Sequence, residues 1–506
     1  MRHLNNRYLL TPTDLAAFLG CRHRTALEMA VAAKKAHRPH WDDPMMDLLF
    51  TRGLAHEAAY VDSLRAAGLT VVDLKSIDDA EQAQDATLDA MERGVDVVVQ
   101  AAVGNDRWRG RPDVLRRVDT PSDLGPWSYE ALDTKLALET RAGTMLQLGL
   151  YSQLLQPLQG VTPTFFHVVT PDPVQPMQSY RTADFAAYLR LVQQRMLASV
   201  SEPDEDLAAA NYPEPVDHCD ICPWSGQCSQ RRRKDDHLSL VAGIASSQRR
   251  ELVSQGVTTL TALAEMALPL PFKPDRGSAE SFARVREQAR LQLASRDAGT
   301  PLWEHKAFVP DEGLCRLPEP SPGDLFLDLE GDRLAENGGR EYLFGLVTLG
   351  GDGAPVYRRW WATNDKEERV AFEEVIDLIV QQVRQHEGAH VYHYAPYEPS
   401  AMKRLMGRYA TREAEVDGLL RNGCFVDLYA VVRQALVAGV ERYSIKNLEP
   451  LYGFTRAVPL REANQALTTL AQALATKTLE TLPDAIRDAV ASYNRDDCVS
   501  TWALRN

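Results

Sequence analysis

The chain has 506 residues, of which 44% are hydrophobic and 25% charged, and its formal net charge is −14 at pH 7. These values are ordinary for a globular protein of two or three domains. The acidic balance argues against a general nucleic-acid coat protein, whose affinity depends on a basic surface. No apolar run approaches the ~20 residues of a membrane span, and the N-terminus lacks the apolar core of a secretory signal. We therefore expect a cytoplasmic protein that does not bind membranes.

Two helices are predicted at the start of the chain. Thr11 is placed to cap the first, with Pro12 in its first turn and Asp14 as the partner of a capping box, and this helix ends near Cys21. The second begins at about Pro44 and carries His56 and Glu57. We expect domain boundaries that give three parts, residues 1–235, 236–320 and 321–506.

The stretch from Gly110 to Tyr151 carries the first set of chemically informative residues. Pro112-Asp113 precedes an apolar strand-like run, and Asp133 and Lys135 are two residues apart, so in a strand both side chains leave the same face. Carboxylates hold hard divalent cations, and a lysine can position or help deprotonate an attacking water. These residues therefore favour metal-dependent phosphodiester hydrolysis.

This arrangement resembles the PD-(D/E)xK nuclease motif, and Gln147 with Tyr151 resembles the Q-x3-Y signature of its RecB-like branch. The resemblance implies a restriction-endonuclease-like mixed sheet flanked by helices. It also implies that Gln147 and Tyr151, at i and i+4 of a helix, support the site and contact DNA.

The resemblance assigns roles to the remaining residues of this first centre. Asp113, Asp133 and His56 would bind Mg²⁺ or Mn²⁺, with Glu57 as the second candidate on the helix. Lys135 would position the attacking water or help to deprotonate it. A histidine on a helix surface without a metal is the alternative for His56.

Seven cysteines are unevenly spaced, and an odd number in a cytoplasmic chain favours metal ligation over disulfides. Cys219, Cys222 and Cys228 form C-x2-C-x5-C, and Cys21 lies far upstream. The pattern resembles the iron–sulfur staple of some RecB-like nucleases, which implies that these four cysteines hold one 4Fe–4S cluster. Zinc, with His23 or His218 as further ligands, and free buried thiols are the alternatives.

The middle segment is predicted to be helical. Arg231 to Lys234 either meets phosphate or is a solvated helix end. Residues 238–264, with Gly256 between two short helices, resemble half of a helix-hairpin-helix DNA-binding unit, or form an ordinary packing hairpin. Prolines 269, 271 and 274 mark a linker, and a charged helix is expected over 280–296.

A second carboxylate pattern begins at residue 324. Asp328 and Glu330 share one face of a predicted strand, and Tyr493 and Asp497 are i and i+4 on a predicted C-terminal helix. Further strands are expected at 342–349, 356–363 and 391–394, with a helix over 367–383.

These pieces resemble the ribonuclease-H-like 3′–5′ exonucleases with the DEDD carboxylate set, in the tyrosine subclass. The resemblance implies that Asp328, Glu330, Glu398 and Asp497 bind two divalent cations and that Tyr493 orients or deprotonates water. The second motif of that family usually reads F-D, whereas here it is Tyr397-Glu398, and Asp427 is an alternative acid. Residues 444–449 match the family's S-x-K-x-L-E stretch, in which Lys446 is expected to be structural or phosphate-facing.

Together the patterns predict a metal-dependent DNA nuclease, an exonuclease acting on single strands or ends in repair, recombination or phage defence. One alternative is a nucleic-acid-binding scaffold in which one or both centres are inactive; another is that the second domain acts on RNA. The chain has no G-x-x-x-x-G-K-[ST] loop, so we expect any motor to be a helicase partner or a helicase region of a longer protein.

Overall fold

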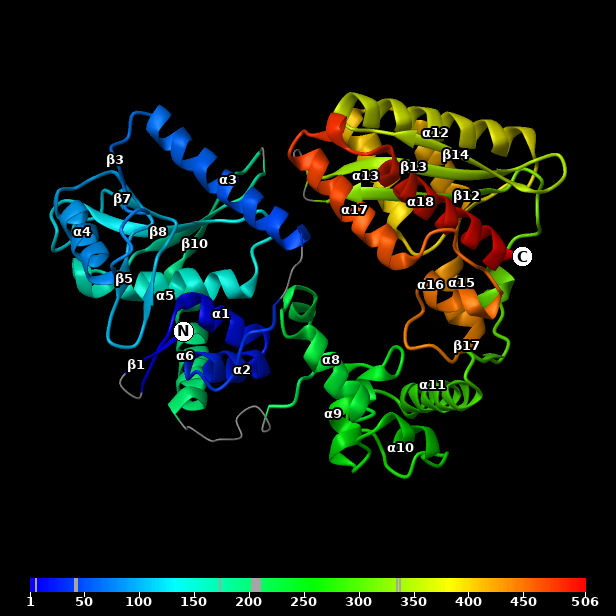
Figure 1. Cartoon of the computed structure of the whole chain (residues 1–506), viewed down its shortest axis with the longest axis horizontal. Coiled ribbons are helices and arrows are strands. Elements are labelled where there is room, and N and C mark those ends of the chain that lie inside the picture. Colours follow the sequence, from blue (N-terminus) through cyan, green and yellow to red (C-terminus); the bar gives the residue numbers. More distant parts are fainter. Residues whose placement is uncertain (5–6, 41–43, 173, 202–210, 334, 336–337) are drawn as a thin grey trace. The chain divides into compact units, whose positions relative to one another are not determined.

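The structure, a computed structural model, describes residues 1–4, 7–40, 44–172, 174–201, 211–333, 335 and 338–506. The chain forms two compact units, Met1–Ser229 and Gln230–Asn506, and each is described by itself (Figure 1). The predicted helical segment 236–320 lies within the second unit. Among the residues described, no helix is long and apolar enough to cross a membrane.

The first unit is built on a six-stranded mixed sheet with the strand order β10-β9-β8-β7-β4-β3. The pairs β3–β4 and β8–β9 are parallel, and the other neighbours are antiparallel. Two small hairpins, β1–β2 and β5–β6, complete its strands. The strands are β1 (Arg2–Leu4), β2 (Arg7–Leu9), β3 (Val71–Asp73), β4 (Val97–Val99), β5 (Val103–Gly104), β6 (Arg109–Gly110), β7 (Val114–Val118), β8 (Ser128–Thr134), β9 (Phe165–Val169) and β10 (Met177–Arg181).

Helices cover both faces of this sheet because its strands alternate their apolar side chains. Tyr129 and Ala131 of β8 pack in the same core as α5, whereas Leu132 packs with α3 on the opposite face (Figure 1). The predicted capping box is confirmed, since Asp14 N donates to Thr11 Oγ1 at 3.1 Å and Thr11 N donates to Asp14 Oδ2 at 2.9 Å. The helices are α1 (Pro12–Gly20), α2 (Arg22–Ala32), α3 (Pro44–Ala66), α4 (Ala80–Glu92), α5 (Ala142–Gln159), α6 (Thr182–Ser201), the 3-10 helix η1 (Asp217–Ile221) and α8 (Ser225–Lys234), the last of which crosses the boundary between the units.

The second unit contains a five-stranded sheet with the order β14-β13-β12-β15-β16. The strands β14, β13 and β12 are antiparallel, and β12, β15 and β16 are parallel. A separate short pair, β11–β17, was not predicted from the sequence. The strands are β11 (Trp303–His305), β12 (Leu325–Asp332), β13 (Arg340–Leu349), β14 (Pro355–Trp361), β15 (Val391–His393), β16 (Phe425–Asp427) and β17 (Leu436–Ala438).

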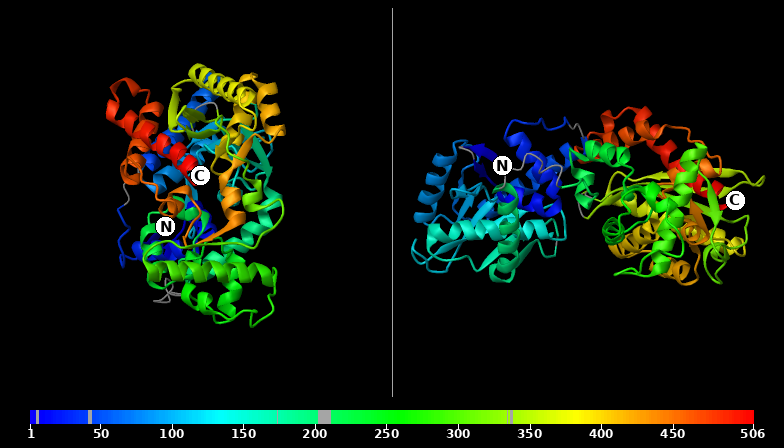
Figure 2. Two further views of the ribbon diagram at one scale, coloured as in Figure 1. Left: turned by 90° about the vertical axis from the view of Figure 1, so that its right-hand side faces the viewer. Right: turned by 90° about the horizontal axis from the view of Figure 1, so that it is seen from below.

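Alternation along β12 separates a purely apolar face from the face that carries the acids. Leu325, Leu327 and Leu329 are buried with α12 and α13, whereas Phe326 is buried with Cys498 of α18. Figure 1 shows helices α12 (yellow) and α18 (red) beside the strands of this sheet, and Figure 2 shows the same ribbon from two other sides. Asp328 and Glu330 have the parity of Phe326 and therefore face α18. The helices around this sheet are α12 (Asp365–Gln385), α13 (Tyr397–Tyr409), α14 (Glu413–Arg421), α15 (Leu428–Ala435), α16 (Ile445–Leu448), α17 (Leu460–Ala475) and α18 (Asp484–Arg505), with the 3-10 helices η3 (Gly313–Arg316), η4 (Glu449–Leu451) and η5 (Leu479–Thr481).

The first part of this unit is helical, as predicted. It consists of η2 (Leu238–Leu240), α9 (Ser246–Ser254), α10 (Leu260–Glu265) and α11 (Ala279–Ala298). Gly256 turns the chain between α9 and α10 with a φ of +82°, a conformation that glycine adopts without strain. Leu252, Leu260 and Phe282 are fully or almost fully buried in a core of their own, so these helices pack on one another.

Candidate metal centres

The first group of acids lies at the ends of the adjacent strands β7 and β8. Asp113 immediately precedes β7, and its Oδ2 accepts hydrogen bonds from the backbone N (2.7 Å) and Oγ1 (2.9 Å) of Thr134. Asp133, the residue before Thr134 in β8, is 2% exposed. Burial and the neighbouring Asp113 carboxylate raise the pKa of Asp133 to about 7.

Lys135 directly follows β8, and its side chain reaches Asp133, as the two-residue spacing predicted. Its ammonium forms an ion pair with Asp133 Oδ2, and about a third of its side chain is exposed. A partly exposed cation beside a buried acid can neutralise that acid and still reach a bound substrate. Asp113, Asp133 and Lys135 therefore lie close together in the structure.

Helix α5 brings Gln147 and Tyr151 to this face. Tyr151 is buried, its hydroxyl donates to the carbonyl of Arg111 at 2.9 Å, and it contacts Gln147. Burial, followed by the negative charge of Asp133, raises the pKa of the Tyr151 phenol. A Cβ on Gly110 would overlap the Tyr151 ring, so the glycine allows Tyr151 to brace the segment that leads to Asp113.

The two candidates on α3 are placed differently. His56 Nε2 lies 3.3 Å from the carbonyl oxygen of Val169, at the end of β9. Glu57 is linked to Asp113 through the side-chain amide of Gln100, which is 2.8 Å from Glu57 Oε1 and 3.5 Å from Asp113 Oδ1. Burial raises the pKa of Glu57, and Asp113 adds to the effect.

Gln100 was not predicted. It follows β4 with a φ of +52°, a left-handed conformation that costs free energy in a residue other than glycine and that is often found at functional sites. Its backbone N also donates to the carbonyl of Asp113 at 2.9 Å. Gln100 thus ties both the backbone and the carboxylate of Asp113 to α3.

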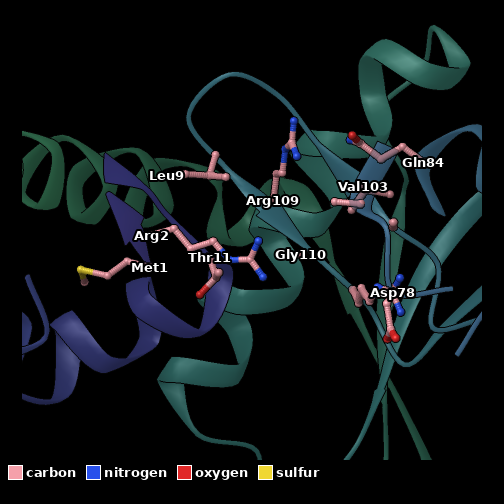
Figure 3. Close-up of a pocket in the computed structure, with 12 residues that line it drawn as sticks. Met1, Arg2, Leu9, Thr11, Asp78, Gln84, Val103, Arg109 and Gly110 are labelled. Atoms are coloured by element: carbon pink, nitrogen blue, oxygen red, sulfur yellow. The ribbon is translucent and has the colours of Figure 1, made fainter. Parts of the chain in front are cut away.

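A pocket of about 260 Å³ lies beside the segment that ends in Asp113 (Figure 3). Arg2, Arg109 and Arg111 line it together with one acid, Asp78, and several apolar side chains. Guanidinium groups match the geometry of phosphate oxygens. The pocket therefore offers phosphate contacts two to four residues along the chain from Asp113.

Three of the four cysteines of the predicted cluster, Cys21, Cys219 and Cys222, lie near one another in the first unit. Cys21 lies at the junction of α1 and α2, and Cys219 and Cys222 lie in and just after η1. Burial raises the pKa of Cys222, and the nearby Cys21 and Cys219 add to that rise. Cys228 lies one turn into α8, where its backbone N donates to Trp224 O at 3.0 Å.

The two histidines that could join a zinc site have other contacts. The Nδ1 of His23 is 2.5 Å from the carbonyl oxygen of Asn211, and the Nε2 of His218 contacts the guanidinium of Arg24. Each contact engages one ring nitrogen, and a metal-binding histidine commonly uses its other nitrogen for such a contact, so both histidines stay candidate zinc ligands.

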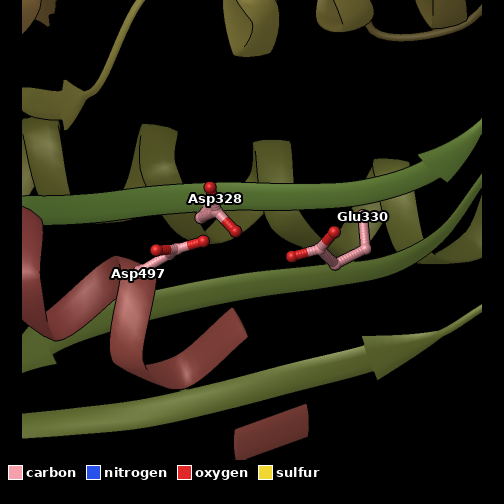
Figure 4. A group of neighbouring side chains, drawn as sticks. All are labelled: Asp328, Glu330 and Asp497. Atoms are coloured by element: carbon pink, nitrogen blue, oxygen red, sulfur yellow. The ribbon is translucent and has the colours of Figure 1, made fainter. Parts of the chain in front are cut away.

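The second group of acids is more compact. One carboxylate oxygen from each of Asp328, Glu330 and Asp497 lies within 4.8 Å of the other two (Figure 4). No other trio of His, Cys, Asp or Glu among the residues described is as close. Three hard oxygen donors at this spacing suit Mg²⁺ or Mn²⁺.

Burial and the neighbouring acids make Asp328 and Glu330 difficult to ionise without a cation. Burial, followed by Asp497 and Glu330, raises the pKa of Asp328 well above its usual range. Burial and Asp497 raise the pKa of Glu330 to about 8. The arrangement is therefore one that a divalent cation would stabilise.

Asn494, one turn before Asp497 on α18, fixes the position of Asp328. Its Nδ2 donates to Asp328 Oδ2 at 2.7 Å, and its Oδ1 accepts from the Tyr357 hydroxyl at 2.7 Å. Gly345 faces Asp328 on β13, and a Cβ there would overlap Asn494 Oδ1. The glycine therefore leaves the space through which Asn494 reaches the acid.

Two basic side chains form ion pairs with Asp497. Lys446 Nζ is 2.8 Å from Asp497 Oδ2, and Arg456 Nη2 is 2.5 Å from Oδ1. Both cations also lie over the Tyr493 ring, at 5.0 and 5.4 Å from its centroid. Burial and Asp497 raise the pKa of Tyr493 to about 12, so it is a neutral phenol at physiological pH.

The fourth predicted acid, Glu398, is buried but lies outside the compact trio. Its Oε2 is 3.5 Å from His393 Nδ1, and its charge contributes to the raised pKa of Asp328. The alternative acid, Asp427, caps α15 instead, since its Oδ1 accepts from Tyr429 N and Ala395 N, both at 2.9 Å. One carboxylate oxygen of Asp427 is therefore engaged by two backbone N–H groups.

Comparison with known protein families identifies the type of domain in the second unit. Residues 325–506 match the family model of the RNase H superfamily, which confirms the expected ribonuclease-H-like domain. A search of curated proteins found no match to the chain. Domains of this superfamily are generally metal-dependent nucleases, and the acidic trio lies within the matched residues.

Proposed function

We propose that the chain is a metal-dependent nuclease that hydrolyses DNA, as an exonuclease on single strands or ends, in repair, recombination or phage defence. The observation that carries the proposal is the compact trio of Asp328, Glu330 and Asp497 within a ribonuclease-H-like domain. Asp328 and Glu330 have raised pKa values, which is typical of functional carboxylates.

In the second centre, the trio would hold Mg²⁺ or Mn²⁺, which supplies Lewis acidity and lowers the pKa of bound water. Asn494 keeps Asp328 oriented toward the trio. Tyr493 stays protonated, so its hydroxyl can orient the attacking water by hydrogen bonding. Lys446 and Arg456 each contact one carboxylate oxygen of Asp497 and hold it in place.

The first unit would contribute a second nuclease centre on a restriction-endonuclease-like, RecB-like sheet. Its support is the convergence of Asp113, Asp133, Lys135 and Tyr151 on one face. Asp113 and Asp133 would hold a divalent cation with either His56 or Glu57, and the contact through Gln100 favours Glu57. Lys135 is placed to position water, and the arginines of the adjacent pocket to contact the strand.

The four thiols would hold a 4Fe–4S cluster that joins the first helices to the end of the same unit. Four cysteine thiolates are the ligand set that such a cluster takes, and zinc, which also binds four thiolates, is the alternative.

The test is digestion of 5′- and 3′-labelled single-stranded DNA, and of RNA of the same sequence, with Mn²⁺. The proteins are the wild type, Lys135→Ala, Asp328→Asn and, as a matched control, Lys366→Ala, which changes an exposed lysine on α12. Loss of cleavage only in Lys135→Ala assigns activity to the first centre, and loss only in Asp328→Asn assigns it to the second. Faster loss of RNA than of DNA would make RNA the substrate.

A scaffold with inactive centres is the second candidate function. The contact of both Asp497 oxygens with Lys446 and Arg456 favours it, because these cations compete with a metal. In that case the chain would bind nucleic acid for a helicase partner. Absence of cleavage by the wild type on DNA and on RNA, with binding retained, supports the scaffold.

A further inference from the structure

The arginine-lined pocket of the first unit gathers cations that have no acidic partners. Arg2 comes from β1, Arg109 from β6, and Arg111 follows β6 directly. Among the residues that the structure describes, the ion pairs of this unit include none of these three arginines. Guanidinium groups that converge on one pocket without carboxylate partners form a binding site for an anion.

Arg109 is held in place while one of its nitrogens lacks an acceptor. Its backbone N donates to the carbonyl of Leu10 at 2.9 Å, which fixes β6 beside the end of β2. Its Nε is buried and has no hydrogen-bond partner among the described residues. A Cβ on Gly104 would lie 2.7 Å from Arg109 Cγ, so the glycine leaves space for this side chain. A buried donor without an acceptor is costly, and a bound anion would remove that cost.

The charge of the pocket suits a phosphate monoester. Asp78 is the single acid among the lining residues, against three guanidinium groups. The ammonium of Met1, which also lines the pocket, is already paired with Asp14 at 2.7 Å. A terminal phosphate carries a charge of about −1.5 to −2 at pH 7, whereas a phosphate within a strand carries a single charge.

The shape of the pocket suits the end of a strand. Leu9 lies on one side and Val103 on the other, with Gly110 between them (Figure 3). Behind Gly110 the space is filled, because a Cβ there would lie 2.7 Å from the Tyr151 ring and 2.8 Å from Pro12 Cδ. The volume of about 260 Å³ is below the roughly 300–1,000 Å³ of sites for drug-sized ligands. The pocket therefore accepts a group of about one nucleotide and not a length of strand.

Arg111 connects this pocket to the first centre. Its guanidinium donates to the carbonyl of Ile77, and its own carbonyl accepts from the Tyr151 hydroxyl at 2.9 Å. Asp113 follows two residues later, so the two Cα atoms are at most about 7 Å apart. A group bound in the pocket therefore lies close to the acids of the first centre.

We propose that this pocket binds the terminal phosphate of a nucleic-acid strand through Arg2, Arg109 and Arg111, and so anchors the strand end beside the first centre. The inference deepens the proposed nuclease function, on which it rests for the class of substrate. No bond of the strand is made or broken in the pocket, so the three arginines are positioning residues.

The test is a binding experiment that does not need cleavage. The full chain with Asp133→Asn and Asp328→Asn is mixed, with a chelator present, with single-stranded DNA that carries a fluorescent label on an internal base. The strands have a 5′-phosphate, a 3′-phosphate or hydroxyl groups at both ends. We expect one phosphorylated strand to bind at least ~10-fold more tightly than the hydroxyl-ended strand in fluorescence anisotropy. Equal affinities for all three strands would overturn the proposal.

The arginines are tested in the same background by Arg109→Ala and by Arg2→Ala, which changes an exposed side chain and so tests the pocket even if Arg109→Ala does not fold. The matched control is Arg195→Ala, an exposed arginine of α6. We expect the preference for the phosphorylated strand to be lost in the pocket variants and kept in the control, with the affinity for the hydroxyl-ended strand unchanged. A preference that persists in both pocket variants places the phosphate elsewhere and refutes the site.

Inorganic phosphate at constant ionic strength separates a phosphate site from general attraction of charge. It should weaken binding of the phosphorylated strand and leave the hydroxyl-ended strand unaffected, and equal weakening of both would argue against the pocket. The two proposals can fail separately. If the wild type degrades neither DNA nor RNA, the nuclease function fails, while the preference for a phosphorylated end still decides what the pocket binds.

Discussion

The sharpest test of the first centre is the effect of pH on its stability when Asp133 is replaced by asparagine. The pKa of Asp133 is raised from 3.8 to about 7, first by burial and then by Asp113. Between these values the unfolded chain has lost the proton while the folded chain keeps it. Stability therefore falls by about 1.4 kcal/mol for each pH unit as pH rises from about 4 to 7 and stays low above 7.

The magnitude follows from the size of the shift. A difference of about three pKa units corresponds to about 4 kcal/mol, which is an upper value because a buried site relaxes around its charge. Asparagine has nearly the same shape and carries no charge. Without metal, we expect Asp133→Asn to stabilise the first unit at pH 8 by a few kcal/mol and to gain about 3 kcal/mol less at pH 5.

The assay is hydrogen exchange followed by mass spectrometry on peptides from β7 and β8, with a chelator present. These peptides report the first unit alone, and exchange rates corrected for pH give the free energy of opening. Asp119→Asn, which changes an exposed acid in the loop after β7, is the matched control. A variant that is less stable than the wild type at pH 8, or a difference that does not change between pH 5 and 8, would refute the assignment of a raised pKa to Asp133.

Three further predictions concern other parts of the structure. Mn²⁺ at millimolar concentration should raise the melting temperature of the wild type more than that of Asp328→Asn in calorimetry, since bound cations relieve repulsion in the acidic trio; an equal rise in both proteins would contradict a site there. Gly345→Ala should push Asn494 away from Asp328 and reduce cleavage by the second centre at least ~10-fold, whereas Gly351→Ala, where a Cβ meets no atom within 4 Å, should cleave normally. Cys222→Ala should lower the melting temperature of the first unit by about 5 °C or more, and the exposed Cys315→Ala should not; equal melting temperatures would argue against the cluster.

Local spacing accounts for the predicted side chains that the structure brings together in each centre. Residues two apart in a strand share a face, which placed Lys135 beside Asp133 and brought Asp328 and Glu330 into one trio. Residues four apart in a helix share a face, which placed Tyr493 near Asp497. These relations hold within one element, so a single sequence contains them.

Contacts between distant segments were not predictable in the same way. Arg456 lies in a loop 41 residues before Asp497 and has no motif around it. Gln100 takes a left-handed backbone conformation that no sequence signal marks, since such conformations favour glycine or asparagine. Asn494 is the exception, because its spacing of three residues from Asp497 on a helix would have placed both on one face.

The two centres stabilise their buried carboxylates in different ways. Without a metal, the first centre has one partly exposed lysine, and its buried Asp133 keeps a proton up to a pH of about 7. The second centre instead surrounds Asp497 with two cations, while Glu330 keeps its proton up to about pH 8. A metal entering the first centre must therefore displace a proton from Asp133. A metal entering the second must also share Asp497 with Lys446 and Arg456, so its affinity depends on how these two side chains are held as well as on pH.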